Sequence, residues 1–258
     1  MRLSGRVAVI TGSRTGIGKG LARAFLAEGA QVVINGRDPS GHSLAKELDR
    51  NGNCVYVVAD IRIREEVDRL VSESIANFGR VDIAVNNAGG SDAFAMIHEM
   101  TDEAWENALS WNIRASFWLT RSVLPGMMSR QWGRIINMSS VEGKQANKAN
   151  IAHYITNKHG LAGLTKATAF EYGAMGITCN AICPGAIETE QMLVSGPAYA
   201  EAAGSTYDEF KRQYAEASAI KRFNTVEEVA SLAVLLASDD GGGINGAQIN
   251  VDGFTAQY

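Results

Sequence analysis

The sequence predicts a single α/β domain, in which a doubly wound, mostly parallel sheet of seven strands carries helices on both faces. Short segments that are almost continuously apolar alternate with longer segments whose apolar residues recur every three or four positions. The first pattern is typical of parallel strands buried on both sides, and the second of amphipathic helices. A chain of 258 residues suits one such domain, and no Pro/Gly/Ser-rich linker, repeat or charge block divides residues 1–258.

The predicted elements follow one another along the chain in a regular order. The strand-like segments are residues 6–11, 31–34, 55–59, 82–85, 134–138, 177–183 and 248–251. The helical segments are residues 19–28, 43–51, 65–77, 103–128, 154–172 and 225–237. The last of these helices begins at a capping signal, since Glu228 follows Thr225 by three residues. Because helices separate consecutive strands, the crossovers are expected to be right-handed and the sheet parallel.

One segment interrupts this alternation. Residues 190–223 contain Gly196-Pro197, Gly204 and helix-like pieces, but no strand. The segment is longer than a connection in a compact domain requires, and such insertions often cover a binding site. We therefore predict a substrate lid at about residues 190–223.

The composition argues against several classes of function. Twenty-four Lys and Arg against 28 Asp and Glu give a net charge of −4, which disfavours a nucleic-acid partner. The three cysteines, at positions 54, 179 and 183, form no Cys-x-x-Cys pair, so neither a disulfide framework nor a metal site is expected. No apolar run has the length of a signal peptide or a membrane span, so we expect a cytoplasmic protein without a membrane partner.

A glycine-rich loop follows the first predicted strand. Gly12, Gly16 and Gly18 stand in it at the spacing G-x-x-x-G-x-G, directly before a helix. Glycines at such a turn let the backbone approach a pyrophosphate, which then sits at the helix N-terminus. A turn that merely needs glycine has the same composition, but the position after the first strand favours a dinucleotide site.

The end of the second strand indicates which dinucleotide binds. NAD-binding proteins place a carboxylate near this point for the ribose 2′-hydroxyl, whereas NADP requires a cation for its 2′-phosphate. Gly36 stands at the carboxylate position and Arg37 follows it; a guanidinium can bind phosphate through two hydrogen bonds. Arg14 in the glycine loop offers a second cation, and Asp38 offers an alternative contact to a ribose. These residues favour NADP(H) over NAD.

A tyrosine and a lysine supply the candidate chemistry. Tyr154 and Lys158 are four residues apart and share one face of a predicted helix. A free tyrosine has a pKa of about 10, and a nearby ammonium group lowers it. The phenol can then exchange a proton with an alcohol or carbonyl oxygen. Such a pair also occurs on solvated helices, so its meaning depends on the surrounding motifs.

With those motifs the chain resembles the short-chain dehydrogenase/reductase family over essentially its whole length. Residues 11–18 match the family's TGxxxGxG loop, residues 86–89 its NNAG motif, residues 154–158 its YxxxK motif and Pro184-Gly185 its PG motif. Within the family, the chain is similar to β-ketoacyl reductases, polyketide ketoreductases and polyol dehydrogenases. The resemblance implies a Rossmann-type fold, a homotetramer, and hydride transfer between NADP(H) and a small ketone or secondary alcohol.

The resemblance also implies a set of cofactor-binding residues. Within it, Asp60 and Ile61 would face the adenine, Asn86 the adenosine ribose, and Ile187 and Thr189 the nicotinamide amide. The full set is Gly12, Arg14, Thr15, Gly16, Ile17, Gly18, Arg37, Asp60, Ile61, Asn86, Ala88, Gly89, Tyr154, Lys158, Pro184, Gly185, Ile187 and Thr189.

The same resemblance completes a catalytic set of Asn112, Ser140, Tyr154 and Lys158. The family's serine stabilises the reacting oxygen from the end of the fifth strand, where Ser139 and Ser140 stand together. We choose Ser140, because Gly143 follows it by three residues and Ser139 would point to the opposite side of the strand. Asn112 matches the family asparagine that holds a proton-relay water in a distorted helix turn.

The substrate is specified more weakly. Ser140, Glu142 and Tyr154 are the predicted substrate contacts. Glu142 and Ile151 stand where 3-hydroxybutyrate dehydrogenases are expected to carry a histidine and a lysine for the substrate carboxylate. The Glu142 carboxylate would repel such an anion, so we expect neutral, polar substrates. A 3-oxoacyl thioester reductase, acting on carrier-protein or CoA substrates, and a non-enzymatic dinucleotide sensor remain as alternatives.

Two further expectations concern surfaces. The segments 103–128 and 154–172 carry apolar residues beyond one core-facing stripe, namely Phe117, Trp118, Phe170 and Tyr172. Helices that are apolar on more than one side suggest a partner surface, in agreement with the implied tetramer. His153, beside Tyr154, is expected at the surface or at the rim of the site.

Overall fold

The computed structural model describes residues 1–91, 93–202 and 204–255, and it contains a sheet of seven strands. The strands are β1 (Val7–Ile10), β2 (Gln31–Gly36), β3 (Cys54–Val58), β4 (Ile83–Asn86), β5 (Gly133–Met138), β6 (Ile177–Pro184) and β7 (Gln248–Val251). They stand in the order β3-β2-β1-β4-β5-β6-β7, and every neighbouring pair is parallel. The predicted doubly wound sheet is confirmed, and it is parallel throughout.

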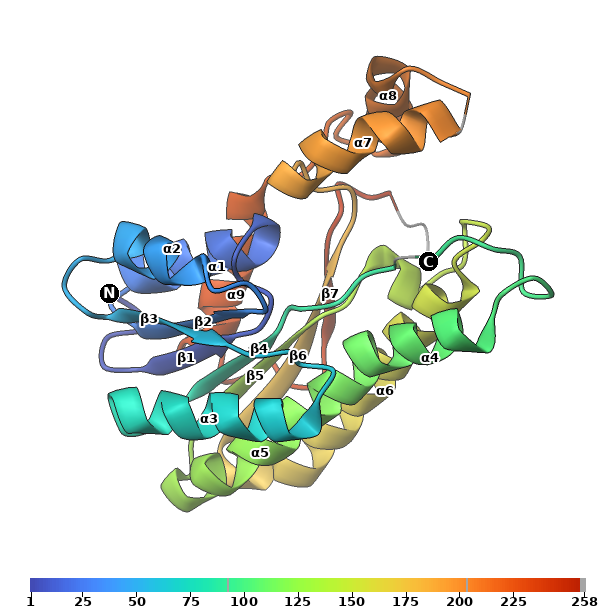
Figure 1. Cartoon of the computed structure of the whole chain (residues 1–258). Helices are drawn as coiled ribbons and strands as arrows, with labels where there is room; N and C mark the ends of the chain where they lie inside the picture. The colour runs from blue at the N-terminus through green and yellow to red at the C-terminus, as the bar shows by residue number, and fades with distance from the viewer. Residues whose placement is uncertain (92, 203, 256–258) are drawn as a thin grey trace.

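Helices cover both faces of this sheet (Figure 1). On one face lie α1 (Gly16–Ala27), α2 (Gly41–Leu48) and α9 (Val226–Ala237). On the other lie α3 (Arg64–Phe78), α5 (Ala115–Arg130) and α6 (Ala152–Tyr172). Successive strand residues serve the two cores in turn, since Ile34 packs with the first group and Val33 with the second. None of the described helices has the length and apolar character needed to cross a membrane.

The predicted helix 103–128 is interrupted. Its first part is α4 (Asp102–Leu109), whose N-cap Thr101 accepts a hydrogen bond of 3.2 Å from the Ala104 amide. A π-helical turn then spans Ser110–Arg114, and α5 continues to Arg130. Such turns inside α-helices occur frequently at functional sites.

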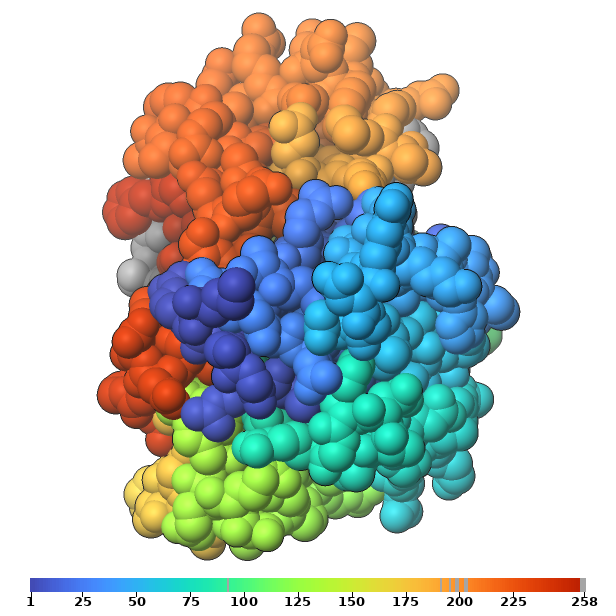
Figure 2. Space-filling model, turned by 90° about the vertical axis from the view of Figure 1, so that its left-hand side faces the viewer, coloured from blue at the N-terminus to red at the C-terminus, as the bar shows by residue number. Residues whose placement is uncertain are grey.

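The segment 190–223 stands apart from the layered body. It contains α7 (Glu190–Ala202) and α8 (Tyr207–Ala217), which lie together beyond the carboxyl ends of the strands (Figure 1). The ring of Tyr207 occupies the space beside Gly196, and its hydroxyl donates to the Met192 carbonyl at 3.2 Å. Figure 2 shows these helices as an orange layer on top of the molecule.

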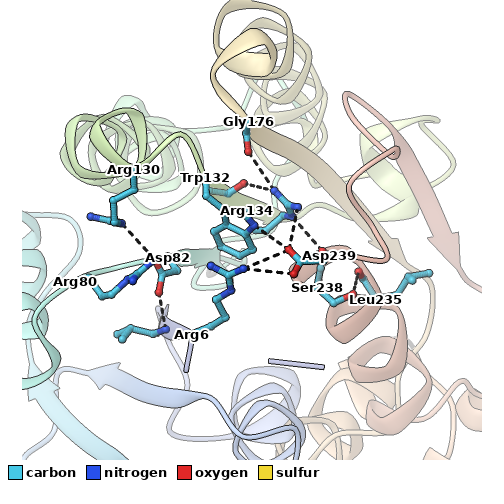
Figure 3. Close-up of polar contacts among 12 residues, drawn as sticks. Arg6, Arg80, Asp82, Arg130, Trp132, Arg134, Gly176, Leu235, Ser238 and Asp239 are labelled. Atoms are coloured by element: carbon cyan, nitrogen blue, oxygen red, sulfur yellow. Dashed lines mark hydrogen bonds and ion pairs between the residues drawn. The ribbon is translucent and has the colours of Figure 1, made fainter. Parts of the chain in front are cut away.

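The opposite end of the sheet, where the strands begin, is held by charged side chains (Figure 3). The fully buried Asp82 carboxylate accepts a hydrogen bond from the Val7 amide at 3.0 Å and pairs with Arg80 and Arg130. The buried Arg134 donates to the carbonyls of Gly133, Gly176 and Ser238. These contacts tie together the beginnings of β1, β4, β5 and β6.

The Trp132 ring belongs to the same cluster. It lies between the guanidinium groups of Arg6 and Arg134, which are 3.6 and 4.4 Å from its centroid, and its indole N–H donates to Asp239 at 2.9 Å. The cluster anchors the amino ends of the strands and leaves the carboxyl ends free to form a site.

Candidate active site

A cavity of about 670 Å³ opens at the carboxyl ends of the strands, where the strand order reverses between β1 and β4. Ligands of open α/β sheets bind at such a switch point. Eleven of the predicted cofactor residues line it: Gly12, Thr15, Gly16, Ile17, Gly18, Arg37, Asp60, Ile61, Ala88, Gly89 and Thr189. The sequence motifs are thus brought together from separate loops.

The glycine loop fits a bound dinucleotide. A Cβ atom on Gly12 would lie 2.8 Å from the Cβ of Ala88, and one on Gly18 would lie 2.6 Å from the Asn87 side-chain nitrogen. Gly16 has φ +56, the left-handed conformation that glycine adopts without strain. The residues of the first turn of α1 line the cavity, where their amides and the helix dipole suit a pyrophosphate.

Two residues of the predicted cofactor set, Asn86 and Arg14, lie outside the cavity lining. The Asn86 side chain donates to Asn137 and Thr120, on the α5–α6 side of the sheet, because alternate residues of a strand point to opposite faces. Its neighbour Asn87 lines the cavity instead. Arg14 does not line the cavity, and its guanidinium pairs with the Asp38 carboxylate at 3.9 Å.

The predicted residues of the PG motif lie beside this cavity, after β6. Pro184 ends the strand, and the Gly185 amide donates to the Val251 carbonyl at 3.0 Å. Ile187 is buried and forms an isolated parallel bridge with Asn224, which fixes the direction in which the chain continues toward α7. Thr189, the last residue before α7, faces the cavity.

The part of the cavity beside the ends of β2 and β3 is strongly charged. The Arg62 guanidinium donates hydrogen bonds of 2.6 to 3.1 Å to the Asp60 carboxylate, and this pairing holds the pKa of Asp60 below its usual value. Arg37 is exposed, lines the cavity and contributes to the same lowering. Gly36 occupies the position at which NAD-binding proteins carry a carboxylate, and it has no side chain.

Tyr154 and Lys158 project from one face of α6, with the lysine nitrogen 5.4 Å from the tyrosine ring centroid. Lys158 is 5% exposed, and its ammonium donates to the Met138 carbonyl at 2.8 Å. Burial lowers the pKa of Lys158 to about 8. The same nitrogen is 3.5 Å from where a Cβ on Gly89 would lie, so it borders the dinucleotide cavity.

The proton affinity of Tyr154 departs from the expectation. Burial raises the pKa of Tyr154 above its usual value, and the charge of Glu142 raises it further. The nearby Ser140 hydroxyl lowers it, whereas Lys158 is not among the groups that shift it. The prediction is wrong on this point, because desolvation of the phenolate outweighs the other effects in this arrangement.

Ser140, and not Ser139, faces the tyrosine. Ser140 is buried, accepts a hydrogen bond from the Glu142 amide at 3.1 Å, and is near enough to Tyr154 to lower the pKa of the phenol. The Ser139 hydroxyl turns to the other side and donates to the Lys158 carbonyl at 3.3 Å. This arrangement agrees with the alternation expected from the strand.

Asn112 lies in the π-helical turn, as the resemblance implies for a distorted turn. Its amide nitrogen donates to the carbonyls of Gly90 and Ala108, and its oxygen accepts from the Gly90 amide at 3.1 Å. That oxygen would be 2.6 Å from a Cβ on Gly89, whose φ is +154. The asparagine thus holds the backbone that borders Lys158.

Glu142 is an unpartnered carboxylate next to the catalytic set. It is 3% exposed, and within the described part of the chain neither of its oxygens has a hydrogen-bond partner. Burial raises its pKa, which the charge of Lys148 and the nearby Asn147 amide lower, although that amide makes no well-formed hydrogen bond. Glu142 is near enough to Tyr154 for its charge to raise the pKa of the phenol.

His153 is the residue that sequence reasoning placed wrongly. It is fully buried rather than at the surface, and its Nε2 lies 3.0 Å from the hydroxyl of Ser91, which lines the cavity. The partner is 62 residues away in the chain, so no local pattern indicated the contact. Through it, α6 is joined to the loop after β4.

Comparisons with known proteins agree with this geometry. A family model described as enoyl-(acyl carrier protein) reductase matches residues 12–254. The chain is 36% identical to a D-β-hydroxybutyrate dehydrogenase of Cupriavidus necator, over 97% of this chain and 98% of that protein. It is 36% identical to a 3β-hydroxysteroid dehydrogenase of Eggerthella lenta, over 99% and 96%.

A solved structure is also similar over its full length. A single-substitution variant of actinorhodin polyketide ketoreductase, determined with NADPH, superposes with a TM-score of 0.92 at 32% identity, over 100% of this chain and 99% of that one. The chain therefore belongs to the short-chain dehydrogenase/reductase family, whose oxidoreductases act on hydroxyl or keto groups with a nicotinamide dinucleotide.

Proposed function

We propose that the protein is an NADP(H)-dependent oxidoreductase that interconverts a small, neutral, polar ketone and its secondary alcohol. The observation that carries the proposal is the convergence of Ser140, Tyr154 and Lys158 beside a dinucleotide cavity bordered by Arg37. When bound, the nicotinamide supplies or accepts the hydride. The rest of the chemistry is proton handling by this chain's own residues.

Tyr154 is the proposed proton donor in the reducing direction. Its raised pKa keeps the phenol protonated at neutral pH, so the phenol can give a proton to a carbonyl oxygen. The Ser140 hydroxyl, close to the phenol, would donate to the same oxygen and stabilise the charge that develops on it. In the oxidising direction the phenolate must form first, so oxidation should rise with pH while reduction is supported at neutral pH.

The choice of NADP(H) is supported by the end of β2. Arg37 borders the cavity, and Gly36 offers no acid that would repel a 2′-phosphate. Asp60 is engaged by Arg62, which reduces its ability to repel an anionic ligand. NAD remains the weaker candidate.

The proposed neutrality of the substrate is supported by Glu142. A buried carboxylate without a partner would repel a substrate carboxylate, and water that screens this repulsion is excluded from its surroundings. Ile151 is buried and apolar at the position where a carboxylate-binding lysine is expected by resemblance. Hydroxyl groups of a polar substrate would instead donate to Glu142.

The two alternatives fit less well. A reductase of carrier-protein thioesters needs a surface that attracts an acidic partner, and this chain has a net charge of −4. A sensor needs no proton donor, whereas this chain carries Ser140, Tyr154, Lys158 and Asn112. NADPH consumption with a panel of ketones, for the natural protein and Tyr154→Phe, tests the enzyme. Equal inactivity of both on a broad panel would favour the sensor.

We also propose that residues 190–223 form a mobile lid over the substrate. Gly204, with φ +69, separates α7 from α8, and the Lys148 ammonium lies 4.5 Å from the Tyr214 ring centroid, which connects α8 to the loop beyond Glu142. Substrate would therefore enter beneath α8. Hydrogen exchange tests this: the amides of α7 and α8 should become protected when cofactor and substrate are both added, and unchanged exchange would contradict the lid.

For the cellular setting we propose the cytoplasm. Cys54, Cys179 and Cys183 are all buried as free thiols, which suits a reducing compartment. Fractionation of the producing cells tests this location.

A further inference from the structure

We propose that Tyr56 is a positioning residue for cofactor choice: it fills the space that a carboxylate at the end of β2 would need, and it holds the loop that carries Arg37. The inference rests on the proposed preference for NADP(H). It explains that preference by a residue that lies behind the residues lining the cavity.

The Tyr56 side chain runs along β2 toward its carboxyl end. Tyr56 pairs with Ile34 in the parallel ladder, and Gly36, two residues further on, points to the same face as Ile34. A Cβ atom on Gly36 would lie 2.6 Å from the Tyr56 hydroxyl oxygen and 3.7 Å from the Cβ of Arg14. Any side chain at position 36 therefore meets the tyrosine first.

The tyrosine cannot easily move aside. It is 5% exposed, and its ring lies so close to Gly41 at the start of α2 that a Cβ there would overlap the ring. The His42 ring packs edge-on against it, with centroids 5.1 Å apart. Two glycines and one tyrosine, from β2, α2 and β3, are thus complementary in shape.

The Tyr56 hydroxyl also fixes the loop between β2 and α2. It donates a hydrogen bond of 2.7 Å to the Asp38 carbonyl, next to Arg37. The Asp38 carboxylate accepts from the Ser40 amide at 2.9 Å and pairs with Arg14. Residues 37–40 are exposed, so this buried hydroxyl supplies the main connection between the loop and the core side of β3. Arg37 borders the cavity because the hydrogen bond from Tyr56 holds the adjacent residue, Asp38, in place.

The structure therefore gives the Tyr56 hydroxyl group two roles. It occupies the space that an acid at position 36, which would select NAD(H), would need. It also orients the loop toward a 2′-phosphate. Substitution of Gly36 alone should not convert the protein to NAD(H), because the added carboxylate has no room.

The first variant is Tyr56→Phe, which keeps the ring and removes the hydroxyl. Loss of one buried hydrogen bond should weaken binding of NADPH, and of 2′,5′-ADP as a probe, by about 3- to 10-fold. Affinity for NADH and for 5′-AMP should stay the same. Dissociation constants are measured by titration calorimetry, and the melting temperature confirms folding. Tyr207→Phe, which loses a tyrosine–carbonyl bond within the lid, is the matched control for dinucleotide affinity.

The second pair tests the steric role. Gly36→Asp alone should lose affinity for both dinucleotides, whereas Gly36→Asp with Tyr56→Ala should regain NADH binding and prefer it to NADPH. The inference is overturned if Tyr56→Phe keeps the natural ratio of affinities, or if Gly36→Asp alone binds NADH as well as the double variant does. If the natural protein binds NADPH no more tightly than NADH, the proposed cofactor preference is contradicted. The ratio of NADPH to NADH affinity in the variants then no longer has a natural preference to be compared with.

Discussion

The Lys158 ammonium donates a hydrogen bond of 2.8 Å to the Met138 carbonyl, at the last residue of β5. This contact joins α6 to the strand that leads into Ser140, so the tyrosine and the serine are held by one connected piece of structure. The ammonium is nevertheless almost entirely removed from water, and its pKa is lowered to about 8 as a result.

A cost in stability follows from that burial. Because the folded-state pKa lies below the unfolded value of 10.5, the unfolded chain binds more protons between pH 8 and pH 10.5, and stability should rise with pH in this window. The gain, relative to Lys158→Met, should be on the order of 3 kcal/mol, and the two proteins should run parallel below pH 8. Urea unfolding across this range measures it, and a constant difference would contradict the assignment. Lys158→Met should also lose activity.

The Arg37 side chain should distinguish the two dinucleotides. Natural protein should bind NADPH about tenfold tighter than NADH, and Arg37→Ala should remove most of this difference by weakening NADPH alone. Arg50→Ala, an exposed arginine outside the cavity lining, serves as the control for general charge. Equal losses for both dinucleotides would show that Arg37 meets something other than the 2′-phosphate.

Glu142→Gln should change substrate preference and stability together. The amide removes the repulsion of anions, so the ratio of kcat/KM for an anionic to a neutral substrate should rise by about tenfold. The folded-state pKa of Glu142 is raised, so the natural residue destabilises the protein above the unfolded pKa of 4.5. The variant should therefore melt higher at neutral pH, and this advantage should vanish at acidic pH. An unchanged substrate ratio would place Glu142 outside the pocket.

Asp82 should matter for folding and not for binding. Asp82→Ala removes the partner of Arg80, Arg130 and the Val7 amide, at a cost of about 2–4 kcal/mol. Affinity for dinucleotides should be unchanged, because the cluster lies at the other end of the strands. Asp240→Ala, at an exposed position nearby, should cost less than about 0.5 kcal/mol. Chemical unfolding and titration of both variants provide the comparison.

Assembly should proceed through α5 and α6. Trp118 and Tyr172 pack against the core, contrary to the sequence-based expectation, but Phe117 is 44% and Phe170 92% exposed. These two rings are proposed to lie against a second copy, in a homotetramer. Sedimentation at micromolar concentration should give the tetramer mass, and Phe170→Asp should give a smaller species. A monomer mass for the natural protein would contradict this.

Much of the fold and of the site is predictable from the sequence. The predicted ends of the strands agree with the observed ends to within two residues. Apolar runs of this kind are buried between two helical layers, which makes them easy to recognise in the sequence. Ser140 is distinguished from Ser139 by alternation alone. The site depends otherwise on ordered motifs, of which each supplies one wall of the cavity.

The remainder depends on contacts between distant segments. The burial of His153 requires Ser91, and the raised pKa of Tyr154 results from desolvation, which no spacing reveals. The orientation of Asn86 away from the cavity follows from the point at which β4 ends, and strand ends are poorly defined by sequence. The role of Tyr56 becomes apparent only from the positions of Gly36 and Gly41 around its side chain.

The anchoring of the amino ends of the strands by Asp82, Arg134 and Trp132 has a consequence for how such a protein can diverge. Substitutions at separate sites that share no contacts add in their effects on stability. A change that strengthens the anchored end therefore raises the tolerance of the whole chain for destabilising changes at Glu142 or in the lid. New substrates can be acquired at one end of the sheet while the reserve of stability that permits them is kept at the other.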